Sequence, residues 1–212
     1  KIFGVASVAV VQVLIWAVLV CGAGAAVMPH VLPDGAMEAA AALQQGGGAA
    51  TAAAGDFDPE TLGAIALATD VGYLAMLFGY LLLFVVGGYL LYSAMFAAVG
   101  SAVDNAQDAA QLQTPIMIPI ILAVIVEMSV LNDPNSPLAF WFSLIPFTSP
   151  VVMMARIPYG IPTWEIVLSL VLLYAAFVGM VWLSAKIYRV GIFMYGKKPT
   201  LREMFRWIRY KY

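Results

Sequence analysis

The chain has 212 residues, of which 63% are hydrophobic and only 10% are charged, and its mean hydropathy is +0.94. This composition excludes a soluble globular domain and predicts an integral membrane protein. The net charge of −2 says little about partners, because the charges are unevenly distributed along the sequence. A single cysteine, Cys21, excludes a disulfide within the chain, and its apolar surroundings favour a packed, unreactive thiol.

Four apolar segments predict an all-α membrane protein with four transmembrane helices. At a rise of about 1.5 Å per residue, the longer segments cross a hydrocarbon core of about 30 Å with some tilt. The predicted spans, in chain order, are residues 2–28, 70–99, 115–131 and 164–185.

The segments between the first three spans are of two kinds. Residues 29–69 are rich in alanine and glycine and predict a flexible extracytoplasmic loop, with short helices at 36–45 and 59–68. Residues 101–113 predict a short polar connector outside the hydrocarbon, in which Asp104 and Asp108 are candidates for contact with a partner or the membrane surface. A cation site is the alternative, but the segment lacks the glycine turn and distal glutamate of a calcium loop.

Glu127 is the ionisable residue of the predicted third span, and such a residue is by default a functional candidate. It lies about one turn from Asn132 and Asp133, however. An interfacial or helix-pairing role is therefore favoured over a role in an ion path.

The segment 134–162 is apolar but contains six prolines, and its single charge is Arg156. Each interior proline removes a backbone donor and clashes with the preceding turn, which predicts two short helical pieces within 138–156, bent near Pro146 and Pro150. Broken backbone at membrane depth persists only when it is buried against protein or lines a cavity. The segment is therefore predicted to be a re-entrant hairpin or the lining of a path.

The tail after the last span is basic and aromatic. Thr200 to Glu203 form a capping-box pattern, and apolar residues then follow at helical spacing. This pattern predicts an amphipathic helix over 199–212 on the cytoplasmic membrane surface, separate from a transmembrane domain over 1–198. Its candidate contacts to the membrane or to a partner are Arg202, Arg206 and Arg209. Nucleic acid is not an expected partner, because the basic cluster joins directly onto a span.

The distribution of basic residues predicts the topology. Eight of the ten lysines and arginines follow the last span, which favours a cytoplasmic C-terminus. Four spans then place Lys1 inside and segment 134–162 outside, as a re-entrant hairpin. A full crossing by that segment places Lys1 outside, which fits the charges slightly worse.

Three strings resemble the transmembrane subunit of bacterial type 2 ABC exporters, in particular the NatB-like or sodium-efflux permeases. They are KIFGVASVAVVQVLIW at 1–16, YSAMFAAVGSAVDNAQDAAQLQTPIMIP at 92–119 and FWFSLIPFTSPVVMMARIPYGIPTWE at 140–165, and the resemblance extends to about Lys198. It implies a six-span fold in which the spans found here are the third to the sixth, so that the chain is the C-terminal portion of a permease. A re-entrant pair of short outer helices precedes the last span in that fold.

The resemblance also implies partners and a location. ATP is expected on a separate ABC ATPase subunit, with no cofactor on this chain, which has no Walker A glycine loop. A second permease copy or a related permease, the lipid bilayer and the bacterial inner membrane complete the expected setting. Sodium is suggested as the exported substrate by the family name alone.

Within this setting, the proline-broken segment is a candidate outer gate. Its prolines leave carbonyls free, and its phenylalanines can close a dry constriction. The candidate gate and path residues are Phe142, Pro146, Phe147, Pro150 and Arg156.

Two other function classes compete with an exporter. An ion-coupled secondary transporter would use Glu127, together with Arg156 and Glu165, although no inverted repeat is evident. A structural subunit of a larger membrane complex is the second alternative. An enzyme is not expected, because the sequence has no GxSxG-like or HExxH-like site and no paired aspartates within the spans.

Overall fold

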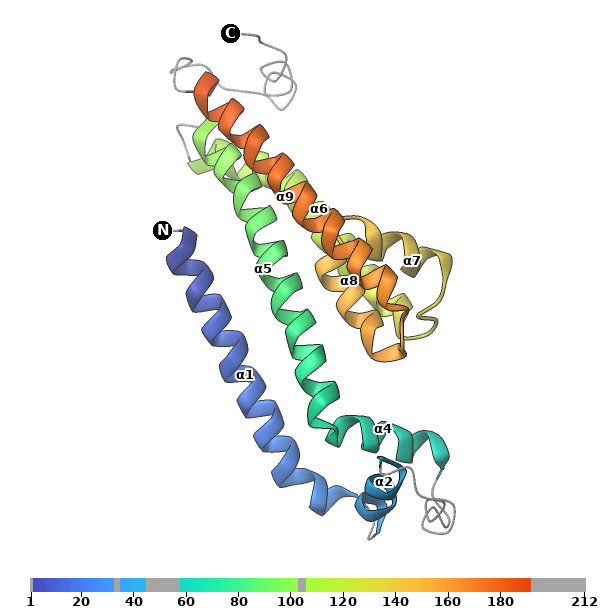
Figure 1. Cartoon of the computed structure of the whole chain (residues 1–212). Helices are drawn as coiled ribbons and strands as arrows, with labels where there is room; N and C mark the ends of the chain where they lie inside the picture. Colours follow the sequence, from blue (N-terminus) through green and yellow to red (C-terminus); the bar gives the residue numbers. More distant parts are fainter. Residues whose placement is uncertain (1, 33–34, 45–57, 103–105, 192–212) are drawn as a thin grey trace. The chain divides into compact units, whose positions relative to one another are not determined.

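The computed structural model describes residues 2–32, 35–44, 58–102 and 106–191, and the regular elements in these ranges are all helices (Figure 1). They are α1 (Ile2–Val31), α2 (Ala36–Gln44), α4 (Pro59–Thr69), α5 (Val71–Ala102), α6 (Ala106–Val130), α7 (Pro137–Leu144), α8 (Ser149–Arg156), the 3-10 helix η1 (Ile157–Tyr159) and α9 (Thr163–Gly191). The chain divides into two compact units, and the boundary along the sequence lies within α5, between Leu82 and Leu83.

Three helices are long and apolar enough to cross a membrane. Their apolar segments are Val71–Ser101 in α5, Ala109–Val130 in α6 and Thr163–Ile187 in α9. In α1, the apolar helical segment among the described residues is shorter and runs over Val10–Gly24. The prediction of an all-helical chain with several long apolar helices is thus confirmed, whereas a fourth span stays a prediction.

The first unit contains α1, α2, α4 and the start of α5. The predicted short helices of the alanine and glycine region are confirmed as α2 and α4, which pack through a cluster of Ala36, Ala40, Ile65 and Ala66. Asp70 lies just before α5 rather than within it. Its Oδ1 accepts hydrogen bonds from the backbone N–H groups of Gly72, at 2.8 Å, and Tyr73, at 3.3 Å. Asp70 therefore caps the helix and satisfies donors that have no partner within it.

The second unit is built around the packing of α5, α6 and α9. A buried cluster joins the three helices, and it consists of Ala98, Val99, Leu112, Ile116 and Ile187. Two hydroxyls of α9 also donate to backbone carbonyls of α5: Ser184 Oγ to Ala94 at 2.6 Å, and Tyr174 Oη to Leu83 at 3.0 Å. Such bonds hold helices together where lipid leaves little hydrophobic driving force for association.

The segment 101–113, predicted to be a short polar connector, is helical from Ala106 onward, and its position outside the hydrocarbon stays a prediction. Helix α6 begins at Ala106, so Pro115 and Pro119 lie inside the helix rather than in its first turns. The preceding residues are mainly alanine, glutamine and leucine, which are strong helix formers, and Leu112 is buried in the three-helix cluster. Local propensity and packing together outweigh the backbone bonds that the prolines remove.

Several sequence predictions fall on residues that the structure does not cover. Asp104 and the predicted C-terminal helix, with Arg202, Arg206 and Arg209, lie outside the described residues. The backbone of Asp108 belongs to α6. Helix α9 runs to Gly191, beyond the predicted end of the last span at residue 185, and its apolar segment ends at Ile187.

Candidate functional site

The proline-rich segment forms two short helices, α7 and α8, joined by a tight turn. The side chain of Ser136 accepts a hydrogen bond from the Ala139 N–H at 3.2 Å and caps α7, whose first residue is Pro137. Pro146 lies in the turn, and Pro150 lies in the first turn of α8, where a missing N–H costs no helical bond. The predicted break into two helices near Pro146 and Pro150 is therefore confirmed.

Hydroxyl groups donate hydrogen bonds to the backbone carbonyls that the turn leaves free. The buried Thr148 Oγ1 donates to the Phe142 carbonyl and, at 3.2 Å, to the Ile145 carbonyl. From α5, Tyr92 Oη donates to the Phe147 carbonyl at 2.6 Å. The turn thus has the internal partners that irregular backbone needs away from water.

Two adjacent glycines allow α5 to approach both α8 and α9. A Cβ at Gly88 would lie 2.9 Å from Pro150 Cγ of α8. A Cβ at Gly87 would lie 2.7 Å from Leu173 Cδ2 of α9. Real Cβ atoms are essentially never found so close, so these contacts require glycine at both positions or a shift of the neighbours.

Arg156, the last residue of α8, is 2% exposed and joins several segments. Its Nε donates to the Pro134 carbonyl at 2.8 Å, and its Nη1 donates to Ser143 Oγ at 2.6 Å. The same Nη1 lies 3.0 Å from Glu165 Oε2 at the start of α9. That contact has ion-pair distance without hydrogen-bond geometry, because Glu165 Oε2 has no hydrogen-bond partner among the described residues.

Ser169 extends this group of contacts along α9. Its buried Oγ donates to the Ser143 carbonyl at 2.7 Å. We refer to Pro134, Ser143, Arg156, Glu165 and Ser169 together as the Arg156 network. The network brings the two ends of segment 134–156 to the beginning of α9, and Figure 1 shows α7 and α8 beside that part of the helix.

The hairpin of α7 and α8 also rests on α6. A buried apolar cluster joins the three helices, and it consists of Ala123, Val126, Val130, Ala139 and Val152. The hairpin is therefore held from three sides: by α6 through apolar packing, by α5 through Gly88 and Tyr92, and by α9 through the Arg156 network.

The sequence-predicted site residues occupy different environments. Phe142, Pro146, Phe147 and Pro150 are half-buried in or beside the turn, whereas Arg156 is buried. Glu127 is half-buried near the end of α6 and is not part of the ion pair between Arg156 and Glu165. The structure thus unites Arg156 with Glu165, but not with Glu127.

Sequence reasoning missed Tyr92, Ser143 and Ser169 as partners of the hairpin. Each is a single hydroxyl in an apolar helix, and the sequence gives no sign of which distant carbonyl such a group will bind. The adjacent Gly87 and Gly88 were the available signal, because small residues indicate where helices approach closely.

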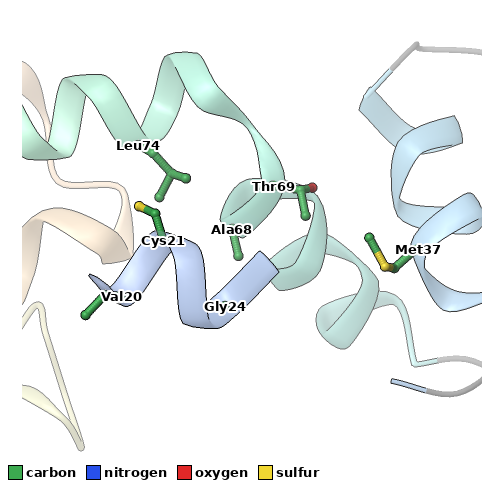
Figure 2. A pocket seen from close by; sticks show the side chains of 7 residues that line it. All are labelled: Val20, Cys21, Gly24, Met37, Ala68, Thr69 and Leu74. Carbon is green, nitrogen blue, oxygen red and sulfur yellow. The ribbon is translucent and has the colours of Figure 1, made fainter. Parts of the chain in front are cut away.

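A cavity of about 480 Å³ lies within the first unit (Figure 2). Its lining residues are Val20, Cys21, Gly24, Met37, Ala68, Thr69 and Leu74. Cys21, expected to be packed, is exposed. The Thr69 hydroxyl donates to backbone carbonyls of its own helix, Ile65 at 2.9 Å and Ala66 at 3.1 Å. The cavity has the size of a small-molecule pocket but lacks convergent polar groups that would orient a ligand.

Among the described residues, no group of histidine, cysteine and carboxylate side chains is arranged to hold a metal ion.

Comparison with known families adds to this geometry. Residues 1–186 match the model of the ABC-2 family transporter proteins. The chain belongs to this family. An ABC-2 family chain with three long apolar helices is a multi-pass membrane protein, and its membership supports the role of an ABC permease. The chain matches none of the curated proteins or solved structures with which it was compared.

Proposed function

We propose that this ABC-2 family chain is the membrane subunit of an ABC exporter, that it lines the translocation path, and that a separate ATPase subunit supplies the energy. Family membership over residues 1–186 is the observation that carries this proposal. A second copy or a related permease completes the path, in a bacterial inner membrane with the C-terminus in the cytoplasm. No substrate is specified by the described residues, and sodium efflux rests on the sequence resemblance alone.

The hairpin of α7 and α8 is proposed to re-enter the membrane from the outer face. One contact supports this topology. The Pro134 carbonyl and the Arg156 guanidinium are hydrogen-bonded at 2.8 Å, so both ends of the segment lie together. A segment that crossed the bilayer would instead separate its ends by about 30 Å.

The depth proposed for the hairpin is supported by two tryptophans of α9. Two exposed tryptophans, Trp164 and Trp182, lie eighteen residues apart on this helix, which corresponds to about 27 Å. Tryptophan is enriched at both membrane–water interfaces, so this separation fits one interface at each tryptophan. Leu173 lies halfway between them and faces Gly87, and the next residue, Gly88, faces Pro150. This geometry supports a hairpin whose turn reaches the middle of the bilayer.

A turn at that depth is suited to an outer gate. The half-buried Phe142 and Phe147, with Pro146 and Pro150, are proposed to close the path by a dry constriction. Arg156 is buried and engaged by the hairpin itself, which favours a supporting role over direct contact with a substrate.

An ion-coupled carrier is less well supported. The carrier considered from the sequence would use Glu127 together with Arg156 and Glu165 as ionisable groups within the membrane. Glu127 is not joined to the Arg156 and Glu165 pair, and that pair is buried against the hairpin. A structural subunit remains the other alternative, and it is separated from a permease by the experiment below.

Purification of the tagged chain from its native membrane in mild detergent tests the proposal. A permease is expected to bring down an ATPase subunit with a Walker A motif in near-equal amount, and the purified complex is expected to hydrolyse ATP. As a control, a Walker A lysine-to-alanine variant of that ATPase should co-purify equally and hydrolyse no ATP. Recovery of the chain without any ATPase would favour the carrier or the structural subunit.

A further inference from the structure

The positive charge of the buried Arg156 is stabilised both by the C-terminus of its own helix and by Glu165. It is the last residue of α8, and Glu165 lies in the first turn of α9. A cation at a helix C-terminus and an anion at a helix N-terminus are each favoured by the helix dipole, in addition to their mutual attraction. Their separation of 3.0 Å, with side chains 2% and 10% exposed, makes this an ion pair protected from solvent.

The local chain brings the two helix ends together. Between Arg156 and Glu165 the backbone forms the short helix η1 and then reverses at Gly160, whose φ is 76°. This left-handed conformation favours glycine because a side chain would contact the following carbonyl. Arg156 and Glu165 meet directly after this reversal, so the pair fastens the end of α8 to the start of α9.

The same guanidinium also fastens the other parts of the hairpin. It donates to Pro134, which precedes α7, and to Ser143 near the end of α7. Ser169 then ties the Ser143 carbonyl to α9. Contact with α5 is of another kind: one hydroxyl bond from Tyr92 and the packing of Gly88 against Pro150. Separating the hairpin from α5 leaves no charge unpaired, whereas separating it from α9 leaves two buried charges unpaired.

We propose that Arg156 is a positioning residue that holds the hairpin of α7 and α8 on the first turns of α9, so that these elements move as one body. Any opening of the hairpin then occurs at its contacts with α5 and α6, which involve no buried charge. The consequence for a gate rests on the proposed function, but the positioning role does not depend on transport.

A buried thiol reports whether the hairpin stays in place. Ser149, the first residue of α8, is fully buried, and its Oγ has no hydrogen-bond partner among the described residues. Ser149→Cys therefore removes no bond, and Cys21→Ala removes the only native thiol. The experiment measures the rate at which N-ethylmaleimide labels this cysteine in membrane vesicles without nucleotide. Labelling of the parent is expected to be slow, because a buried thiol reacts only when the structure opens locally.

Variants of the ion pair give the decisive comparison. Arg156→Met is expected to raise the labelling rate at least about tenfold, because it leaves Glu165 buried without its cation. Glu165→Gln is expected to raise the rate less, because the amide keeps a polar partner for the guanidinium. Adding Glu165→Gln to Arg156→Met should lower the rate relative to Arg156→Met alone, since it removes the unpaired carboxylate charge. Lys186→Met removes a positive charge elsewhere on α9, where Lys186 lies over the Trp182 ring, and should leave labelling unchanged.

Two results would overturn the proposal. One is an unchanged labelling rate in both single variants, and the other is a double variant that labels faster than Arg156→Met. If Arg156→Met fails to insert, Glu165→Gln and Arg156→Lys decide the question: faster labelling supports the proposal, and parental rates contradict it. Because the assay requires neither nucleotide nor substrate, failure here is distinguishable from failure of the proposed function.

Discussion

Replacement of Gly88 by alanine tests the packing of the hairpin on α5. The new Cβ would lie 2.9 Å from Pro150 Cγ and 3.0 Å from Pro150 Cβ. The proline ring is part of the backbone and cannot rotate away, so α5 and α8 must move apart. Overpacking of this kind costs about 1–3 kcal/mol, whereas the better helix propensity of alanine contributes about 1 kcal/mol. The net expectation is a loss of about 1 kcal/mol.

Two other glycines of the same helix provide matched controls. A Cβ at Gly100 meets nothing within 4 Å, so Gly100→Ala should increase stability by up to about 1 kcal/mol. Gly87→Ala meets the flexible end of Leu173 at 2.7 Å and should fall between the other two variants. The expected difference between Gly88→Ala and Gly100→Ala is therefore about 2 kcal/mol.

Thermal unfolding of the purified chain in detergent measures this order. For a chain of this size, about 1 kcal/mol corresponds to roughly 2–4 °C in Tm. Gly88→Ala should melt several degrees below Gly100→Ala, with the unmodified protein between them. A Gly88→Ala variant that melts at or above Gly100→Ala would refute the close contact between α5 and Pro150.

Two further substitutions examine the turn between η1 and α9 and the turn between α7 and α8. Gly160→Ala places a side chain at φ 76° and should lower stability by about 1–2 kcal/mol. Gly179→Ala, where a Cβ on α9 would meet nothing within 4 Å, should not lower stability. Equal melting temperatures of the two variants would contradict the left-handed turn. Tyr92→Phe removes the 2.6 Å hydrogen bond to the Phe147 carbonyl and should lower stability by about 0.5–2 kcal/mol. It should also increase labelling of the Ser149→Cys reporter. Tyr80→Phe on the same helix should have neither effect. Equal labelling in the two tyrosine variants would show that the bond does not hold the turn.

The sequence predicted the parts of the fold that depend on local chemistry. Proline acts directly on its own backbone, so Pro146 and Pro150 indicated the boundary between α7 and α8 to within a few residues. Hydropathy likewise located three of the long helices. Hydropathy alone did not decide the status of α1, whose qualifying apolar segment among the described residues is Val10–Gly24.

The start of α6 shows where local rules compete. Polarity indicated a connector up to Gln113, and Pro115 indicated a helix start. Helix propensity and the burial of Leu112 favoured a helix from Ala106 instead, with the prolines inside it. The sequence alone does not decide between the proline signal and helix propensity, because the burial of Leu112 depends on packing against α5 and α9.

Arg156 shows the limit of sequence reasoning about the site. As the single charge of an apolar segment, it was a candidate residue, but a role lining the path was one of several uses for such a residue. Its surroundings depend on a carbonyl at Pro134, a hydroxyl at Ser143 and a carboxylate at Glu165. These groups come from three segments, and only the folded arrangement brings them to one guanidinium.

Nucleotide-dependent exposure of the hairpin turn tests the central claim most directly. In a Cys21→Ala background, Phe147→Cys is labelled by a membrane-impermeant maleimide in the complex with its ATPase, first without nucleotide and then with ATP and vanadate. The account predicts clearly different labelling rates in the two states, because the proposed gate would open or close the outer path when ATP binds. Equal rates in a complex that hydrolyses ATP would contradict a gate at this hairpin.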